Sequence, residues 1–326
     1  DALPISEQRY LGQGPEPRPL EGICVGIKDE MPIKGQLCSM GSLRYKDDVA
    51  EYTDPVGQRL IDAGAILHAR TTAPEFSCAG FTHSRLWGVT RNPWNPELGV
   101  GGSSGGTGAS LASGTSTLAT GSDIGGSIRI PAAWNGVVGF KPPYGRVPAL
   151  PPFNLDTYCH DGPMGRTVEE ACLQLAATAG MSAGDPLSYP LDPSSFLLPE
   201  TVDLSRLRVA YTEDYGGAPV EKGIRQTFRA KIKAMKHLFA SVDEVEVDYG
   251  GADRCFDVIR AVSFLSRYQD LYANKRHLLG PNIVANYELG ASMTLADCAW
   301  AIGIAEPAAS IQGGLGGAIV NFSQYY

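Results

Sequence analysis

Residues Gly99–Pro131 read GVGGSSGGTGASLASGTSTLATGSDIGGSIRIP, a stretch that holds two glycine-serine clusters. The first cluster is Gly101–Gly106 and the second is Gly125–Ser127. Glycine permits positive φ angles and lets the backbone come close to a ligand. A short helix and a strand between the clusters would let them fold back on each other. We therefore predict one pocket in which Ser103 and Ser127 are surrounded by free backbone N–H groups.

Flexible linkers and phosphate-binding loops are also rich in glycine and serine. A solvated linker would not carry the large apolar side chains that alternate with these glycines: Leu111, Leu118, Ile124, Ile128, Ile130 and Trp134. A phosphate-binding loop of the P-loop type ends in Gly-Lys-Ser/Thr, and neither cluster is followed by that ending. Both alternatives are therefore disfavoured.

Ser127 stands directly before a predicted helix, Ile128–Ala133. The N–H groups of a glycine turn that leads into a helix favour negative charge. A serine there can attack a carbonyl carbon while neighbouring N–H groups hold the developing oxyanion. Ser127 is therefore the candidate nucleophile.

The stretch resembles the signature of the amidase signature family of Ser-Ser-Lys hydrolases. Other family motifs are resembled by Gly22–Asp29, Asn92–Pro96, Gly139–Pro142 and His160–Glu169, in the same order. Five ordered motifs over roughly the first 180 residues are far more specific than a single GGSSGG. The resemblance implies an α/β fold, with a large, mixed, twisted β-sheet covered by helices on both sides.

The resemblance also assigns catalytic roles. It makes Ser127 the nucleophile, Ser103 the bridging serine that relays the proton, and Lys28 the general base. In the family the bridging serine follows a cis peptide bond, which here would join Gly102 and Ser103. A Ser-His-Asp triad is the weaker alternative, because the resemblance requires no histidine.

Lys28 can act as a base only after losing its proton, and burial favours the neutral form of a lysine. The apolar residues Ile23, Val25, Ile27 and Ile124 make a dry site plausible. For an arbitrary lysine in this position, the ordinary interpretation is an exposed side chain paired with Asp29 and Glu30. The resemblance favours the buried base.

The glycine turn before the predicted helix and the family resemblance indicate further site residues. The N–H groups of Ile124, Gly125, Gly126 and Ser127 are the predicted oxyanion donors. The family places the loop after Phe76 against the substrate, which makes Ser77, Cys78, Ala79 and Gly80 the candidate substrate-binding residues. We expect Ser104 to support the loop by hydrogen bonds, and Asp123 and Arg129 to hold the turn.

The composition limits the remaining functions. The formal net charge of −8 argues against nucleic acid and anionic membrane surfaces as partners. No apolar run reaches the ~18 residues of a spanning helix. Seven scattered cysteines are typical of free thiols in a reduced compartment, so we expect a cytoplasmic protein. Neither cysteines nor histidines show metal-ligand spacing, and we expect neither metal nor cofactor.

Periodicity and capping signals predict the remaining elements. We predict strands over Ile23–Ile27, Ala65–Ala69, Thr117–Thr120, Leu207–Tyr211 and Val242–Val247. We predict helices over Val56–Ala63, Thr167–Gly180, Val220–Phe239 and Asp253–Arg276, one opened by Thr294–Asp297, and a short one that starts within Thr72–Phe76. Residues 1–20 and Ser77–Trp87 are expected to be loops.

These elements favour a single domain over residues 1–326, with the signature core at about 20–180 and a second lobe at about 200–310. The chain begins at Asp1 without a methionine, so we expect a trimmed N-terminus. The family's later Thr…Asn…Gly-Pro stretch has no match before Tyr326. We therefore expect a divergent or incomplete last third, which leaves one pocket wall and the substrate choice open.

The sequence thus predicts an amidase that acts on a small-molecule amide, either an aryl or alkyl amide or an anilide. Carbamates (urethanes) and esters stay open as substrates. Two alternatives are a glutamine-hydrolysing subunit of a tRNA-dependent amidotransferase and a binding protein that kept the fold without activity. Dimers are common in the family, so a homodimer is the assembly that the resemblance implies.

Overall fold

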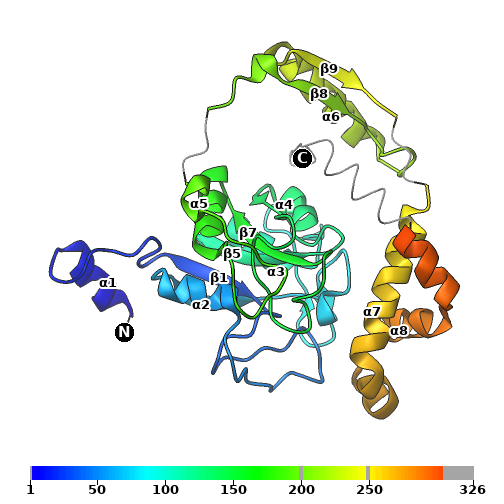
Figure 1. The fold of residues 1–326 in the computed structure, drawn as a ribbon, viewed down its shortest axis with the longest axis horizontal. Coiled ribbons are helices and arrows are strands. Elements are labelled where there is room, and N and C mark those ends of the chain that lie inside the picture. The colour runs from blue at the N-terminus through cyan, green and yellow to red at the C-terminus, as the bar shows by residue number, and fades with distance from the viewer. Residues whose placement is uncertain (1, 198–200, 247–249, 304–326) are drawn as a thin grey trace. The chain divides into compact units, whose positions relative to one another are not determined.

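The structure, a computed structural model, describes residues 2–197, 201–246 and 250–303. It divides into two compact units (Figure 1). The first comprises residues 1–199 and 275–283, and the second residues 200–274 and 284–326. The expected single domain stays a prediction.

The first unit is built on a five-stranded sheet in the order β2-β1-β5-β7-β6 (Figure 1). Its strands are β1 (Cys24–Lys28), β2 (Ile66–Thr71), β5 (Leu118–Asp123), β6 (Val138–Gly139) and β7 (His160–Gly165). β1 runs parallel to β2 and β5, whereas β7 is antiparallel to β5 and β6. The mixed sheet confirms the predicted α/β class.

Helices cover both faces of this sheet. They are α2 (Pro55–Asp62), α3 (Gly105–Ala112), α4 (Arg129–Asn135) and α5 (Val168–Thr178). Neighbouring residues of a strand point to opposite faces. Leu118 of β5 packs in one core with Leu60 of α2 and Leu175 of α5, while Ala119 packs in another with Leu111 of α3. The predicted covering of both faces is thus confirmed.

Local capping signals fix several helix starts. Asp54 accepts a hydrogen bond from the Val56 N–H at 2.8 Å, and Pro55 occupies the first turn of α2. Thr167 and Glu170 form the predicted capping box of α5. These helices therefore begin where the sequence predicts.

The predicted loop over residues 1–20 is wrong in part, because Ala2–Tyr10 form helix α1. Two side chains of this helix contact the segment that leads into β1. The Ser6 hydroxyl donates to the Glu21 carboxylate at 2.7 Å, and the Tyr10 hydroxyl donates to the Glu21 carbonyl at 2.8 Å. The helix is thus tied down by tertiary contacts that its weak amphipathic pattern does not reveal.

The segment after β2 also differs from expectation. The short helix predicted from Thr72–Phe76 is a single 3₁₀ turn, η1 (Glu75–Ser77). Phe76 and Ser77 adopt positive φ angles of 50° and 55°, which prevent a longer helix. Two short strands, β3 (His83–Ser84) and β4 (Gly88–Val89), form a hairpin in and beside the predicted loop.

The second unit contains a strand–helix–strand unit with parallel strands, as its sequence predicts. Its elements are η3 (Leu204–Arg206), β8 (Arg208–Tyr211), α6 (Lys222–Met235), η4 (Lys236–Leu238), β9 (Ser241–Glu244) and α7 (Ala252–Lys275). Two further 3₁₀ turns, η2 (Pro193–Phe196) and η5 (Arg276–Leu278), belong to the first unit. Helix α8 (Pro281–Ser292) was not predicted, and residues 295–303 form the helix that Thr294 opens. The expected end of β9 at Val247 lies outside the described residues. No helix in the described ranges combines the length and the apolar character that a membrane crossing requires.

Replacement of Gly106 tests how closely α3 packs on the strand end. A Cβ at Gly106 would lie 2.3 Å from the Thr72 amide nitrogen, which belongs to the backbone and cannot swing away. Alanine would improve helix propensity by ~1 kcal/mol, but the overlap costs more. We expect Gly106→Ala to lower the free energy of unfolding by about 2 kcal/mol in urea denaturation.

Gly80→Ala is the matched control, because a Cβ at Gly80 meets open space. It should leave the unfolding midpoint near that of the wild type. Equal stability of the two variants would show that the Thr72 backbone yields to the added methyl group.

Candidate active site

The alternation of β1 decides where Lys28 points. Val25 and Ile27 lie in the core under α2 and α5, so Lys28, the last residue of the strand, faces the other side of the sheet. Its backbone N–H donates to the Thr120 hydroxyl of β5 at 2.9 Å. The residue is only 1% exposed, so the alternative of an exposed surface lysine is wrong.

Three oxygens surround the Lys28 Nζ atom. They are Ser103 Oγ at 2.7 Å, Ser122 Oγ at 2.8 Å and Glu30 Oε1 at 2.9 Å. The structure thus brings together the two residues proposed as base and bridge. The Gly102–Ser103 peptide bond is cis, as expected.

Sequence reasoning missed two of these contacts. Ser122 stands at the end of β5, and the parallel pairing of β1 and β5 could have found it, since parallel strands end at the same sheet edge. The sequence indicates Glu30 only as a surface partner of Lys28. It is instead part of the buried cluster, with a side chain 17% exposed.

The two glycine-serine clusters meet through their backbones. The Ser104 N–H donates to the Ser127 carbonyl at 3.1 Å. The Ser104 hydroxyl accepts from the Ser122 N–H at 3.4 Å, which supports its expected role in setting the loop. Ser103 is fully buried, whereas Ser127 is partly exposed. This arrangement leaves Ser127 accessible at the surface of the cluster.

Asp123 organises the turn that carries Ser127. Its carboxylate accepts from the N–H groups of Gly126 at 2.6 Å and Ile128 at 3.2 Å, and from two guanidinium nitrogens of Arg129 at 2.9 Å each. Burial acts to raise the pKa of Asp123, but Arg129 and the backbone amides together hold it below its usual value. The predicted structural role of both side chains is confirmed.

The same contacts bear on the predicted oxyanion donors. The Gly126 N–H is engaged by Asp123. Within the described residues, the N–H groups of Ile124, Gly125 and Ser127 have no hydrogen-bond acceptor. Three of the four predicted donors are therefore open to a ligand.

The predicted substrate loop makes two structural contacts. The Ser77 hydroxyl donates to Glu30 Oε2 in a short hydrogen bond. The Cys78 carbonyl accepts from the Asn282 amide of α8. Ala79 is half-buried and Gly80 is exposed, with open space where a side chain would stand. Of the four predicted residues, Ala79 and Gly80 are the two whose side-chain positions carry no contact of this kind.

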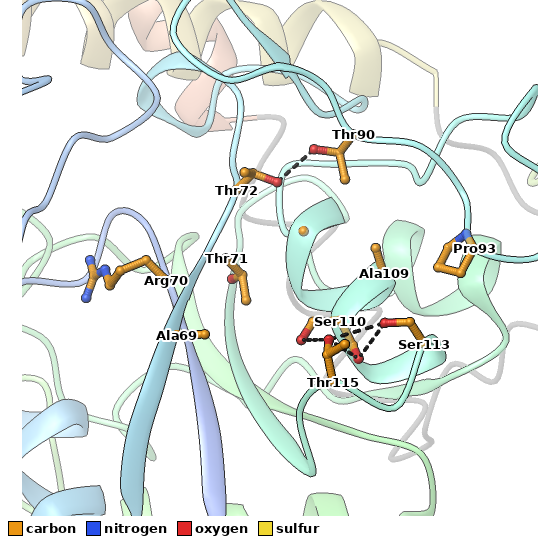
Figure 2. A pocket seen from close by; sticks show the side chains of 11 residues that line it. Ala69, Arg70, Thr71, Thr72, Thr90, Pro93, Ala109, Ser110, Ser113 and Thr115 are labelled. Carbon is orange, nitrogen blue, oxygen red and sulfur yellow. Dashed lines mark hydrogen bonds between the residues drawn. The ribbon is translucent and has the colours of Figure 1, made fainter.

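A separate hollow of about 360 Å³ lies between β2, α3 and the loop through Thr90 and Pro93 (Figure 2). Six of its eleven lining residues carry a hydroxyl group: Thr71, Thr72, Thr90, Ser110, Ser113 and Thr115. Figure 2 shows several of them bonded to one another, such as Thr72 and Thr90 at 2.7 Å. Lys28, Ser103 and Ser127 do not line this hollow, so it is not the site of the proposed chemistry.

The comparisons with known proteins agree with this geometry. The model of the family described as Amidase matches residues 4–294. The chain is 38% identical over 236 residues to the A subunit of the glutamyl-tRNA(Gln) amidotransferase of Exiguobacterium sibiricum, covering 71% of this chain and 48% of the relative. The corresponding protein of Gloeothece citriformis is 39% identical over 233 residues, which is 69% of this chain and 47% of the relative.

Solved structures give a similar result. A bacterial aryl acylamidase of the amidase signature enzymes superposes with a TM-score of 0.87 at 26% identity, over 96% of this chain and 67% of that chain. A 6-aminohexanoate cyclic dimer hydrolase complexed with substrate superposes with a TM-score of 0.76 at 25% identity, over 93% and 65%. The chain spans about half the length of the curated relatives that it matches.

Removal of Arg129 tests the role of the Asp123 pair. Arg129→Met leaves a fully buried carboxylate without its cation, and since the Arg129 side chain is 39% exposed we expect a loss of about 2 kcal/mol at pH 7. Because the pKa of Asp123 is lowered in the folded wild type, the ionised pair stabilises the fold at pH values above the pKa that Asp123 has in the unfolded chain. The deficit of the variant should therefore shrink as the pH falls through about 4.

Urea denaturation at pH 7 and at a pH below about 4 measures this difference. Arg166→Met is the control, since Arg166 precedes α5 and forms with Glu170 a solvent-accessible ion pair that contributes little. A deficit of Arg129→Met that does not depend on pH would contradict the electrostatic explanation.

Proposed function

The chain belongs to the amidase family, and on that premise we propose that it cleaves the C–N bond of an amide through a covalent acyl-enzyme on Ser127. The observation that carries the proposal is the 2.7 Å contact between the buried Lys28 Nζ and Ser103 Oγ. An amide carbonyl is a poor electrophile, and a covalent intermediate divides its hydrolysis into two easier steps.

In the first step Ser127 Oγ attacks the carbonyl carbon. Its proton passes to Ser103 Oγ, while Ser103 gives its own proton to neutral Lys28. The same relay then runs in reverse and protonates the leaving nitrogen as the C–N bond breaks. In the second step a water molecule attacks the ester on Ser127, and the relay returns the proton to Ser127.

Charge on the carbonyl oxygen develops next to the turn held by Asp123. The unengaged N–H groups of Ile124, Gly125 and Ser127 are the proposed oxyanion donors. Fixed backbone donors of this kind contribute roughly 3 kcal/mol each to transition-state stabilisation in other enzymes. Gly126 contributes instead to the shape of the turn, because its N–H is bonded to Asp123.

The proposed substrates are small aryl or alkyl amides and anilides, with carbamates and esters as further members of the same electrophile class. The structural similarity to an aryl acylamidase and to a 6-aminohexanoate cyclic dimer hydrolase supports this choice. The candidate contacts from the substrate loop are Ala79 and Gly80. A homodimer and a cytoplasmic location stay predictions. None of the seven cysteines is in a disulfide bond, all of them lying within the described residues.

Labelling with a fluorophosphonate probe tests the nucleophile. We expect the wild type to gain one adduct by intact mass, and Ser127→Ala to gain none and to lose amide hydrolysis by at least ~10³-fold. Ser113→Ala, on the exposed end of α3, is the control and should label normally. Retention of wild-type turnover by Ser127→Ala would falsify the proposal.

A second candidate function is glutamine hydrolysis within a tRNA-dependent amidotransferase. The 38% identity to the A subunit of a glutamyl-tRNA(Gln) amidotransferase favours it. The Glu30 carboxylate beside Lys28 argues against it, because it would repel the α-carboxylate of glutamine.

Release of the aniline from an anilide, compared with release of ammonia from glutamine, distinguishes the two functions. We expect hydrolysis of a neutral anilide with a kcat/KM at least ~10-fold above that for glutamine. A repulsion of about 1.4 kcal/mol between Glu30 and the α-carboxylate corresponds to that ratio. The reverse order of the two substrates would assign the chain to the amidotransferase function.

A further inference from the structure

Glu30 reaches Lys28 because the chain turns sharply after β1. The N–H groups of Glu30 and Met31 both donate to the Lys28 carbonyl, at 2.8 and 3.1 Å. This turn brings the Glu30 side chain back alongside the lysine, with Oε1 at 2.9 Å from Nζ. The other carboxylate oxygen, Oε2, is held by the Ser77 hydroxyl. Glu30 is thus held at Oε2 by a hydrogen bond and at Oε1 by the ion pair with Lys28.

The number of donors on Lys28 gives these contacts a chemical meaning. A lysine ammonium has three N–H donors, and Ser103, Ser122 and Glu30 supply three oxygens. The neutral amine keeps two N–H donors and gains one lone pair. When Ser122 takes one donor and the ion pair with Glu30 draws the other toward the carboxylate, the lone pair is left facing Ser103. That orientation is the one a base must have to accept the Ser103 proton.

Glu30 also stands as an anion beside the lysine. Burial acts to raise the pKa of Glu30, but the charge of Lys28 and the hydrogen bonds from Ser122, Ser77 and Lys28 hold it below its usual value. Glu30 therefore keeps its negative charge at neutral pH. The Glu30 carboxylate lies 2.9 Å from Nζ, where it attracts positive charge on that atom electrostatically.

Other titratable groups face Glu30 from the neighbouring elements. They are Cys38 from the loop after β1, Asp54 at the start of α2, Arg70 on β2, Cys159 before β7 and Asp161 on β7. Burial and neighbouring carboxylates raise the pKa of Asp54 to about 6 and that of Asp161 well above its usual value. These two groups hold protons more readily than Glu30, so the charge next to Lys28 resides on Glu30.

We propose that Glu30 is a positioning residue that orients the Lys28 amine toward Ser103 and sets the pH above which Lys28 becomes a base. This inference rests on the proposed function, since it concerns the proton relay of the same site. It adds to the Ser-Ser-Lys set a carboxylate that controls when the relay is active. The enzyme should consequently be inactive at low pH and gain activity as Lys28 loses its proton.

The test compares Glu30→Gln with the wild type. Glutamine keeps a carbonyl oxygen for Lys28 and an atom within reach of Ser77, but it removes the charge. We measure kcat/KM for an anilide and the rate of fluorophosphonate labelling from about pH 5 to about pH 10, a range that spans the ordinary ionisation of lysine. In Glu30→Gln the midpoint of the rising limb should move to lower pH by about one unit or more.

Glu169→Gln is the matched control. Glu169 is an exposed carboxylate in the first turn of α5, and its replacement should leave the midpoint where it is in the wild type. A simple structural role of Glu30 would lower the rate at every pH and leave the midpoint unchanged. That result in a folded Glu30→Gln overturns the inference.

Glu30→Asp supplies the measurement if Glu30→Gln does not fold. Its carboxylate is retained but withdrawn by one carbon–carbon bond, so the midpoint should move in the same direction by a smaller amount. An unchanged midpoint in this variant contradicts the inference. Failure of the wild type to label at any pH would instead contradict the proposed function, so the two failures are distinguishable.

Discussion

The site depends on a lysine ammonium or amine held out of water at the end of a buried strand. Burying a lysine is unfavourable unless polar partners replace the water that it loses. Lys28 obtains these partners from three separate places: the turn directly after its own strand, the neighbouring strand β5 and the first glycine-serine cluster. The parallel pairing of β1 with β5 is what brings them together, because both strands end at the same edge of the sheet.

A second carboxylate, that of Asp123, holds the turn that carries the proposed nucleophile Ser127. Asp123 ends β5, and its oxygens collect backbone N–H groups from the following turn together with the Arg129 guanidinium. The Gly126 N–H is bonded to Asp123 in forming the turn, and the N–H groups of Ile124, Gly125 and Ser127 have no acceptor within the described residues. The glycines of the second cluster therefore have different tasks: Gly126, with φ of 116°, adopts a backbone conformation that other residues rarely reach, whereas Gly125 offers an unengaged N–H.

The sequence predicts those parts of the fold that depend on neighbouring residues. The Asp54-Pro55 start of α2 and the Thr167–Glu170 capping box lie within one turn of the helix that they begin. Helix α1 could not be predicted in this way, since it depends on the buried Glu21, fifteen residues from its partner Ser6. The pairing of Lys28 with Ser122 spans 94 residues and follows only once the strand register is known. The resemblance supplies Lys28, Ser103 and Ser127, but it carries no information on Glu30.

The contacts of Glu30 connect the proposed catalytic base, Lys28, to the proposed substrate loop. Ser77 holds the carboxylate that contacts Lys28, and its neighbour Cys78 is bonded to Asn282 at the start of α8. Phe76 and Ser77, which adopt positive φ angles, lie directly at these two contacts. A ligand that displaces Ala79 or Gly80 would therefore act on the Ser77–Glu30 hydrogen bond, and through it on the lysine. In this arrangement the proposed substrate loop and the proposed proton relay share one chain of contacts through Ser77, Glu30 and Lys28.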